Sequence, residues 1–130
     1  MGFCTAVNCM DGRVQLPVIE FLTERFSVEY VDMITEPGPN RVLARQTNAR
    51  QVESIVEKVQ FSIERHNSVG VAVIGHHDCA GNPAEHTEQT GDTIAAVEYL
   101  RKQLARFEEV ELIGLWVDED GSVSEIPAGS

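Results

Sequence analysis

Hydrophobic residues recur along this chain in two alternating patterns, short apolar runs and longer stripes with a helical period. The short runs predict four β-strands, at residues 3–7, 28–34, 69–74 and 110–117. The third run reads VGVAVI and is almost continuously apolar. Such a run is typical of a strand that is buried on both faces of a parallel sheet.

Three segments between these runs carry apolar residues three or four positions apart, which predicts amphipathic helices. The first begins near Pro17, because proline suits the first turn of a helix. The second begins at Asn48, which forms a capping-box pattern with Gln51, and the third extends over residues 92–107. The predicted inward stripes are Val18, Ile19, Leu22 and Phe26 in the first helix, Val52, Ile55, Val56, Val59 and Ile63 in the second, and Ile94, Val97, Leu100, Leu104 and Phe107 in the third.

Turn-forming and polar residues separate these elements. Residues 36–40 read EPGPN and are predicted to be loop, because two prolines and a glycine disfavour regular structure. Residues 75–91 are predicted to form a polar loop. Residues 118–121 are predicted to turn the chain, after which residues 122–126 can return as a short edge strand.

Strands that alternate with helices indicate an α/β fold with right-handed crossovers. We expect residues 1–130 to form a single domain, a three-layer sandwich with a mostly parallel sheet of strand order 2-1-3-4 and a short antiparallel edge strand. In such sheets ligands bind at the carboxyl ends of strands, where the strand order reverses. With this order, the loops at residues 8–13 and 75–81 face each other.

Composition and charge narrow the range of partners. The chain has 21 acidic against 10 basic residues, a net charge of -11, which argues against nucleic acid and anionic membranes as partners. No segment has the ~20 consecutive apolar residues of a membrane span, and the N-terminus lacks the pattern of a signal peptide. We therefore expect a cytoplasmic protein. Three cysteines in such a chain favour metal binding or catalysis over disulfides.

The two facing loops contain the residues of a metal site. Cys9 lies in the first loop, and His76 and Cys79 lie three residues apart in the second. Two thiolates and one imidazole suit a single Zn²⁺ per chain and leave one tetrahedral position open, as in catalytic zinc sites. The alternatives are that Cys9 is a small buried hydrophobe, as we expect for Cys4, and that His76 is an ordinary surface histidine.

Charged residues flank these predicted ligands. Asp11 and Arg13 are either a solvated ion pair or a dyad in which the arginine keeps the carboxylate charged and orients its free oxygen. His77 is either a proton shuttle, since the pKa of histidine lies near neutrality, or an exposed loop residue. Asp78 can orient His76 or pair with a nearby base, and we expect His86 to lie on the surface.

These residues resemble the zinc site of β-class carbonic anhydrases. The pattern is Cys9-x-Asp11-x-Arg13 followed by His76-x-x-Cys79. Residues 71–81 resemble that family's strand leading into its second metal loop, and residues 110–126 resemble its last strand and hairpin. The resemblance implies a β-carbonic-anhydrase-like fold and a dimeric enzyme. It also implies that Cys9, His76 and Cys79 are the zinc ligands, and that Asp11 and Arg13 are the catalytic dyad that orients the zinc-bound water.

The resemblance also has departures. Residues 35–40 stand where the family usually carries Arg-Asn-Ala-Gly-Asn, so only Gly38 and Asn40 are kept as substrate-binding residues. Ala80 replaces a usual glycine, and His77 replaces a small hydroxyl residue. The chain begins close to its first predicted strand, so we expect a compact member without the family's N-terminal helical arm.

The function expected from this site is the reversible hydration of carbon dioxide to bicarbonate by attack of zinc hydroxide. One alternative is a zinc-dependent hydrolase of carbonyl sulfide or carbon disulfide, and another is a non-catalytic zinc-binding homologue. A thiol redox role for Cys4 and Cys9 is disfavoured, because the chain has no Cys-x-x-Cys pair. We expect a homodimer or larger homo-oligomer, because a short chain needs apolar residues from a neighbour to exclude water from the site.

Overall fold

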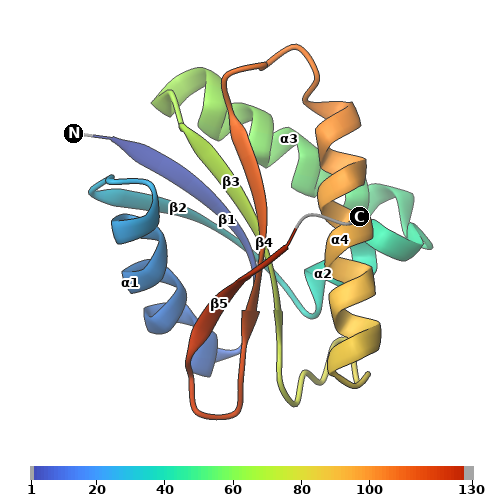
Figure 1. Cartoon of the computed structure of the whole chain (residues 1–130). Helices are drawn as coiled ribbons and strands as arrows, with labels where there is room; N and C mark the ends of the chain where they lie inside the picture. The colour runs from blue at the N-terminus through green and yellow to red at the C-terminus, as the bar shows by residue number, and fades with distance from the viewer. Residues whose placement is uncertain (1, 128–130) are drawn as a thin grey trace.

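The computed structural model describes residues 2–127, which form an α/β fold around one five-stranded sheet (Figure 1). The strands are β1 (Phe3–Cys9), β2 (Tyr30–Glu36), β3 (Gly70–His76), β4 (Glu111–Val117) and β5 (Val123–Ile126). Their order is β2-β1-β3-β4-β5. The first four strands are parallel and β5 pairs antiparallel with β4. The predicted order and the antiparallel edge strand are therefore confirmed.

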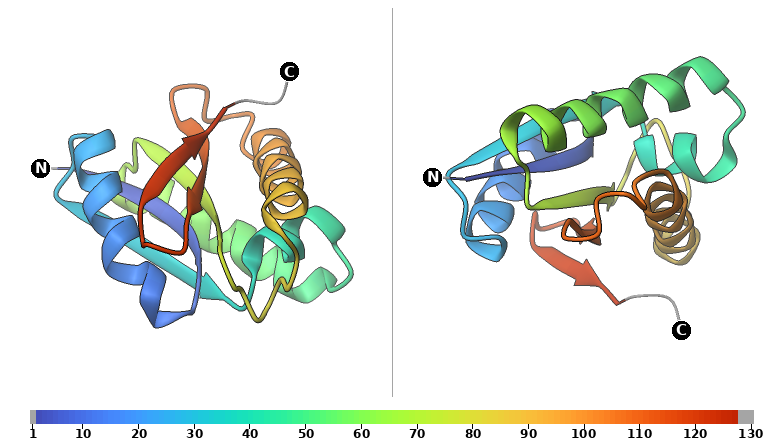
Figure 2. Two further views of the ribbon diagram at one scale, coloured as in Figure 1. Left: turned by 60° about the horizontal axis from the view of Figure 1, so that its bottom comes forward. Right: turned by 90° about the horizontal axis from the view of Figure 1, so that it is seen from above.

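Helices cover both faces of this sheet and complete the three layers (Figure 2). They are η1 (Gly12–Val14), α1 (Gln15–Arg25), α2 (Pro39–Arg45), α3 (Ala49–His66) and α4 (His86–Gln103). The single turn η1 leads into α1, which lies on one face, and the other three helices lie on the opposite face. Right-handed crossovers produce this division where the strand order reverses between β1 and β3.

Alternate residues of the strands supply two separate cores. On β1, Cys4 and Ala6 belong to the core under α1, whereas Val7 belongs to the core under α2, α3 and α4. All seven residues of β3 are buried, which confirms the prediction of a strand covered on both faces. Both cores consist largely of valine, isoleucine and leucine, so the sheet is a rigid support for the loops at its carboxyl end.

Two of the predicted loops are partly helical, and these predictions were wrong in extent. Helix α2 begins at Pro39, inside the stretch that was predicted to be loop, because proline at the first helical position loses no hydrogen bond. Helix α4 begins at His86, whereas the sequence pattern placed its start near residue 92. The polar first turn of α4 is largely exposed, and it therefore lacks the apolar stripe on which the prediction depended.

Two local predictions about helices had mixed outcomes. Asn48 caps α3, since its side chain accepts a hydrogen bond of 3.2 Å from the backbone N–H of Gln51. The reciprocal half of a capping box is absent, because the Gln51 side chain donates to Glu36 Oε1 at 3.2 Å instead. Ile19 was predicted to face the core but is 36 % exposed on α1.

Within the described helices, none has both the length and the hydropathy of a membrane span.

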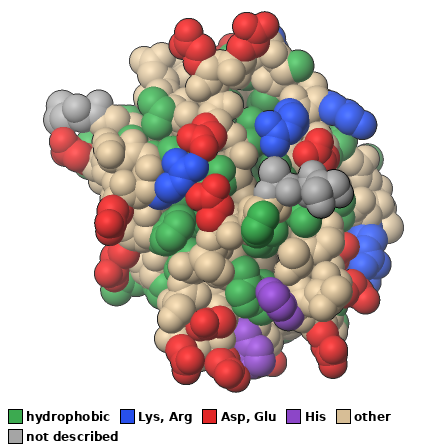
Figure 3. All heavy atoms as spheres, in the orientation of Figure 1, with side chains coloured by type: hydrophobic (Ala, Val, Ile, Leu, Met, Phe, Trp, Pro, Cys, Tyr) green, Lys and Arg blue, Asp and Glu red, His purple; other side chains and the backbone are tan. Residues whose placement is uncertain are grey.

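The surface reflects the acidic composition. Acidic side chains are dispersed around the face drawn in Figure 3, and arginine and lysine side chains lie among them. Arg25, for example, bridges Glu111 and Glu125 at 2.6 and 2.8 Å. Such pairs lie at the surface, where each contributes little to stability.

Candidate metal centre

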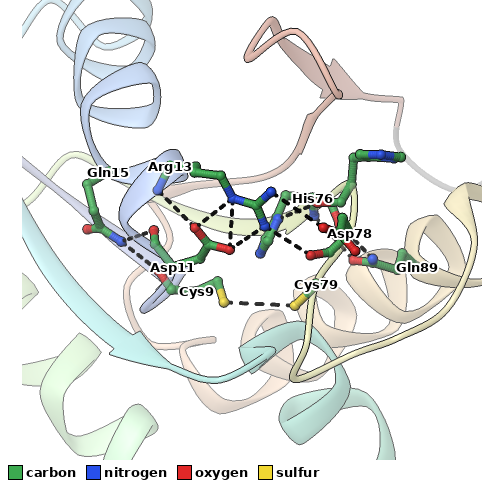
Figure 4. Close-up of polar contacts among 9 residues, drawn as sticks. Cys9, Asp11, Arg13, Gln15, His76, Asp78, Cys79 and Gln89 are labelled. Carbon is green, nitrogen blue, oxygen red and sulfur yellow. Dashed lines mark hydrogen bonds and ion pairs between the residues drawn. The ribbon is translucent and has the colours of Figure 1, made fainter.

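The carboxyl ends of β1 and β3 bring two cysteines and one histidine together (Figure 4). Cys9 is the last residue of β1, His76 is the last residue of β3, and Cys79 follows in the next turn. Their candidate ligand atoms all lie within 4.8 Å of one another, and the two Sγ atoms are 3.8 Å apart. All three residues are buried. The predicted convergence of the two loops is therefore present, in a geometry that could hold a metal ion.

The imidazole of His76 is oriented for coordination. Its Nδ1 lies 2.8 Å from the carbonyl oxygen of His77, to which it can donate. This bond leaves Nε2 as the ring atom with a free lone pair, and within residues 2–127 the buried Nε2 has no hydrogen-bond partner. A buried polar atom without a partner is costly, whereas a metal ion would satisfy it. Histidine ligands in metalloproteins are commonly held in this way by a backbone carbonyl.

The sulfur atoms of Cys9 and Cys79 lie close enough to share one hydrogen bond. The Cys79 thiol hydrogen-bonds the Cys9 sulfur, and this bond lowers the pKa of Cys9 although burial opposes the change. The nearby His76 side chain and the backbone at Gly38 and Asp11 lower the pKa of Cys9 further. The hydrogen bond with Cys9 and the burial of the thiol both raise the pKa of Cys79. A divalent cation would relieve this competition, because it favours two thiolates at once.

Asp11 and Arg13 form the predicted close pair beside this group. Arg13 Nη2 donates to Asp11 Oδ2 at 2.7 Å, and Arg13 Nε donates to Asp11 Oδ1 at 3.1 Å. These hydrogen bonds, with a third from the backbone N–H of Arg13, lower the pKa of Asp11 to about 2. The carboxylate therefore stays ionised near neutral pH. Among the described residues, Asp11 is not a member of the group that lies within 4.8 Å.

Arg13 also connects the two loops. Its Nη2 donates to the carbonyl oxygen of Asp78 at 3.1 Å, and its Nη1 lies 3.5 Å from Asp78 Oδ2. Asp78 thus pairs with a nearby base, and the carbonyl of His77 is the group that orients His76. Gln15 fixes the backbone of the first loop, because its Nε2 donates to the carbonyl oxygens of Cys9 and Asp11 at 2.7 and 3.0 Å.

The remaining predicted site residues lie near this centre in different environments. Gly38 has a φ of +57° and packs directly against the backbone of Gly81. Asn40 is buried, and its amide bonds Gln89, Thr93 and Asn82, so its predicted contact with substrate stays a prediction. His77 is exposed, and together with His86 and Trp116 it lines a hollow of about 530 Å³ that reaches Cys79. A shuttle role for His77 also stays a prediction.

Several polar residues around the centre were missed from the sequence. They are Gln15, Asn82, Gln89 and Thr93, and the last three are buried. Gln89 and Thr93 lie four residues apart and continue the inward stripe of α4 towards its N-terminus, since Ala96, Val97 and Leu100 are buried on the same helix. Extending the helical period upstream of the first apolar residue would have found both of them.

Comparison with known proteins agrees with this geometry. A sequence-family model described as "Putative carbonic anhydrase" matches residues 1–127. The chain belongs to this family. No curated protein sequence matches the chain significantly. The carbonic anhydrase family is therefore shown by the family match, and the metal and the reaction have to be argued from the site.

Solved carbonic anhydrases, several of them described as β-carbonic anhydrases, share the fold at low sequence identity. Isoform I from Trichomonas vaginalis is 17 % identical, with a TM-score of 0.64 over 98 % of this chain and 83 % of that one. A carbonic anhydrase from Streptococcus mutans is also 17 % identical, with a TM-score of 0.56 over 95 % and 81 % of the two chains. A tetrameric β-carbonic anhydrase from Sordaria macrospora is 13 % identical, with a TM-score of 0.55 over 99 % and 82 %.

Proposed function

We propose that this carbonic anhydrase family member binds one Zn²⁺ through Cys9, His76 and Cys79 and catalyses the reversible hydration of carbon dioxide to bicarbonate. The observation that carries the proposal is the buried imidazole of His76: one of its ring nitrogens lies within 4.8 Å of two thiol sulfurs, and its Nε2 has no hydrogen-bond partner among the described residues. Two sulfurs and one imidazole nitrogen are a set that zinc accepts, with a fourth position left for substrate chemistry. The ionised carboxylate of Asp11 lies beside this set.

The residues of the chain would divide the work as follows. Zinc supplies the nucleophile in sites of this kind, because it lowers the pKa of water from about 15.7 to roughly 7. Asp11 stays charged and would accept a hydrogen bond from the attacking water, which would orient its oxygen towards carbon dioxide. Arg13 makes a bidentate contact with both carboxylate oxygens of Asp11, so the carboxylate keeps one orientation during turnover.

The contacts of Arg13 with the second loop also help to keep the groups of the site in fixed positions. Because the guanidinium bonds both Asp11 and the carbonyl of Asp78, it keeps the first loop at a fixed distance from the second. A shift of about 1 Å between the groups that bind and orient reactants can lower a rate on the order of 100-fold. Residues on the two loops therefore act as one unit.

We further propose that the chain works as a homodimer or larger homo-oligomer. Met10 follows Cys9 directly and is 62 % exposed, and Leu16 on α1 is 63 % exposed. A second copy that covered these side chains would exclude water near the centre. Sedimentation equilibrium should give at least twice the chain mass of 14.4 kDa, and Leu16→Glu should weaken the association. A monomeric mass at micromolar concentration would contradict this proposal.

The catalytic proposal is tested with three proteins loaded with zinc: the unchanged chain, Asp11→Asn and Asp120→Asn. Asp11→Asn keeps the size of the side chain but removes its charge, and it should lower carbon dioxide hydration in stopped flow by about 100-fold or more, as general acid–base groups do. Asp120 lies on the exposed turn before β5, so Asp120→Asn should leave the rate unchanged.

Metal content is measured in parallel by elemental analysis. One zinc per chain is expected in all three proteins, and His76→Asn should abolish it. Full zinc occupancy without any hydration activity in the unchanged chain would refute the catalytic proposal and leave a zinc-binding homologue. Faster turnover of carbonyl sulfide than of carbon dioxide would show that the substrate assignment is wrong.

A further inference from the structure

Strands β1 and β3 separate before they reach the metal centre. Their parallel pairing, as far as the described residues show it, runs from Thr5 opposite Val71 to Val7 opposite Val73. Both strands continue beyond this point, β1 to Cys9 and β3 to His76. The candidate ligands therefore lie on the two arms of a fork, and among the described residues no pairing between β1 and β3 reaches them.

The backbone of His76 is bonded instead by a side chain. Gln89 Nε2 donates to the carbonyl oxygen of His76 at 2.7 Å, and the N–H of His76 donates to Gln89 Oε1 at 3.2 Å (Figure 4). A carboxamide has the same donor and acceptor as a peptide group. Gln89 thus makes the pair of bonds that a neighbouring strand would make with its own backbone.

This carboxamide has only one orientation available to it. Besides its two bonds to His76, its Oε1 accepts from Asn40 Nδ2 at 3.3 Å, and its Nε2 donates to the carbonyl oxygen of Ala84 at 3.3 Å. The side chain is 0 % exposed. An amide offers two donor hydrogens and two acceptor lone pairs, so all four are in use. A fully satisfied buried network of this kind specifies a single geometry.

The neighbouring residue on β3 makes room for this arrangement. A Cβ on Gly75 would lie 2.9 Å from Asn40 Nδ2, 2.9 Å from Thr93 Oγ1 and 3.2 Å from Gln89 Oε1. Contacts that short would push the network away from the strand. Glycine at this position therefore lets the polar groups of α2 and α4 approach the backbone of β3 next to His76.

We propose that Gln89 is a positioning residue for the metal centre. Its carboxamide replaces the missing strand neighbour at the fork and fixes the backbone of His76, and thereby its imidazole, relative to Cys9 on the other arm. This inference rests on the proposed metal site. It goes beyond that proposal because it assigns the geometry of one ligand to a residue of α4 that lies outside the set of candidate ligands.

The test compares Gln89→Met with a matched control, Ser62→Ala. Methionine has a similar length but cannot form the four hydrogen bonds of Gln89. Ser62 is also buried, and it belongs to a hydrogen-bonded cluster with Thr5, Ser68 and Asp32, a group separate from the metal ligands. Both substitutions disrupt a buried polar network, so both should lower the urea midpoint of the metal-free protein. Only Gln89→Met should alter the metal centre.

Two readouts separate positioning from general stability. The zinc dissociation constant, measured by competition with a chelator, should rise about 10- to 100-fold in Gln89→Met, as expected when an outer contact of a ligand is lost. The visible absorption bands of the cobalt(II)-substituted protein should shift in the same variant. Ser62→Ala should match the unchanged chain within about twofold in affinity, and its cobalt bands should not move.

The outcomes distinguish the two proposals. If the unchanged chain binds no zinc, the proposed function fails, and this inference fails with it. If the unchanged chain binds zinc and Gln89→Met binds it as tightly as Ser62→Ala does, with the same cobalt bands, only the positioning role is overturned. Should Gln89→Met not fold, Gln89→Asn decides by the same criteria, because it keeps a carboxamide that is one methylene too short to reach both groups of His76.

Discussion

Gly38, in the loop after β2, packs against Gly81, in the loop after β3, and alanine at either position should push these two loops apart. A Cβ on Gly81 would lie 2.3 Å from the carbonyl carbon of Pro37 and 2.5 Å from the nitrogen of Gly38. A Cβ on Gly38 would lie 2.6 Å from the carbonyl carbon of Gly81. The backbone of Gly38 lowers the pKa of Cys9, and Gly81 lies two residues after Cys79. We therefore expect the contact to influence the spacing of both sulfurs.

The expected cost differs between the two positions because only Gly38 has a positive φ, +57°. Gly81→Ala should cost about 3 kcal/mol of unfolding free energy, the upper end for overpacking, since its new atom meets backbone rather than a movable side chain. Gly38→Ala adds a left-handed conformation that costs roughly 1–2 kcal/mol, for a total of about 4–5 kcal/mol. Gly121→Ala is the matched control, because Gly121 has a φ of +79° but nothing within 4 Å of its added Cβ. It should cost only about 1–2 kcal/mol.

Urea unfolding of the metal-free proteins measures these differences, provided that the slope of the transition stays constant. Zinc affinity, measured by chelator competition, should fall in Gly38→Ala and Gly81→Ala and stay unchanged in Gly121→Ala. Gly81→Ala with a free energy of unfolding within about 0.5 kcal/mol of the unchanged chain, and with unchanged zinc affinity, would refute the argument that this contact sets the geometry of the site.

Three further predictions follow from other contacts. Arg13→Lys keeps a positive charge but loses the bidentate contact with Asp11, so the zinc-loaded variant should hydrate carbon dioxide at least about 10-fold more slowly in stopped flow. An unchanged rate would contradict the role of the bidentate contact. Removal of metal should accelerate alkylation of Cys9 and Cys79 in a peptide-mapping assay, because a metal-bound thiolate is protected. Cys4, whose pKa burial raises to about 12, should stay unmodified in both states, and its modification would indicate unfolding. Asn48→Ala should lower the free energy of unfolding by about 1 kcal/mol without a change in zinc affinity, and no loss in urea would show that the cap is dispensable.

The parts of the fold that were predictable are those in which burial produces a clear period. The continuous apolar run of β3 and the stripe of α3 identify their elements because each buries a defined set of side chains. The first turn of α4 and the start of α2 were missed for the opposite reason. The first consists mainly of exposed polar residues, and the second begins with proline, which also occurs in loops. Ile19 fits the period of α1, yet a single helix cannot bury every apolar residue that it carries.

The residues of the site also fall into those that the sequence predicts and those that it does not. Cys9, His76 and Cys79 were predictable because their residue types are chemically distinctive and because the carboxyl ends of neighbouring parallel strands meet. Gln89 was not predicted, since glutamine occurs throughout protein surfaces and its role depends on the separation of β1 from β3. The length of strand pairing is a property of the folded backbone, and no local pattern of residues specifies where two parallel strands part.

This separation explains why the centre lies where it does. Paired strands are only ~5 Å apart, and their backbones use their own hydrogen bonds, so a metal site between them needs the pairing to end first. Beyond Val7 and Val73 the two backbones are free to diverge, and the polar groups of His76 that pairing would have satisfied require other partners. Gln89 meets that requirement from α4, and Arg13 connects the loop after β1 with the loop after β3. The Gly38–Gly81 contact joins the loop after β3 to the loop after β2, and the candidate ligand atoms of Cys9, His76 and Cys79 lie within 4.8 Å of one another. The fork and the polar residues that surround it therefore depend on one another, and the loss of Gln89 or of the Gly38–Gly81 contact should lower metal affinity.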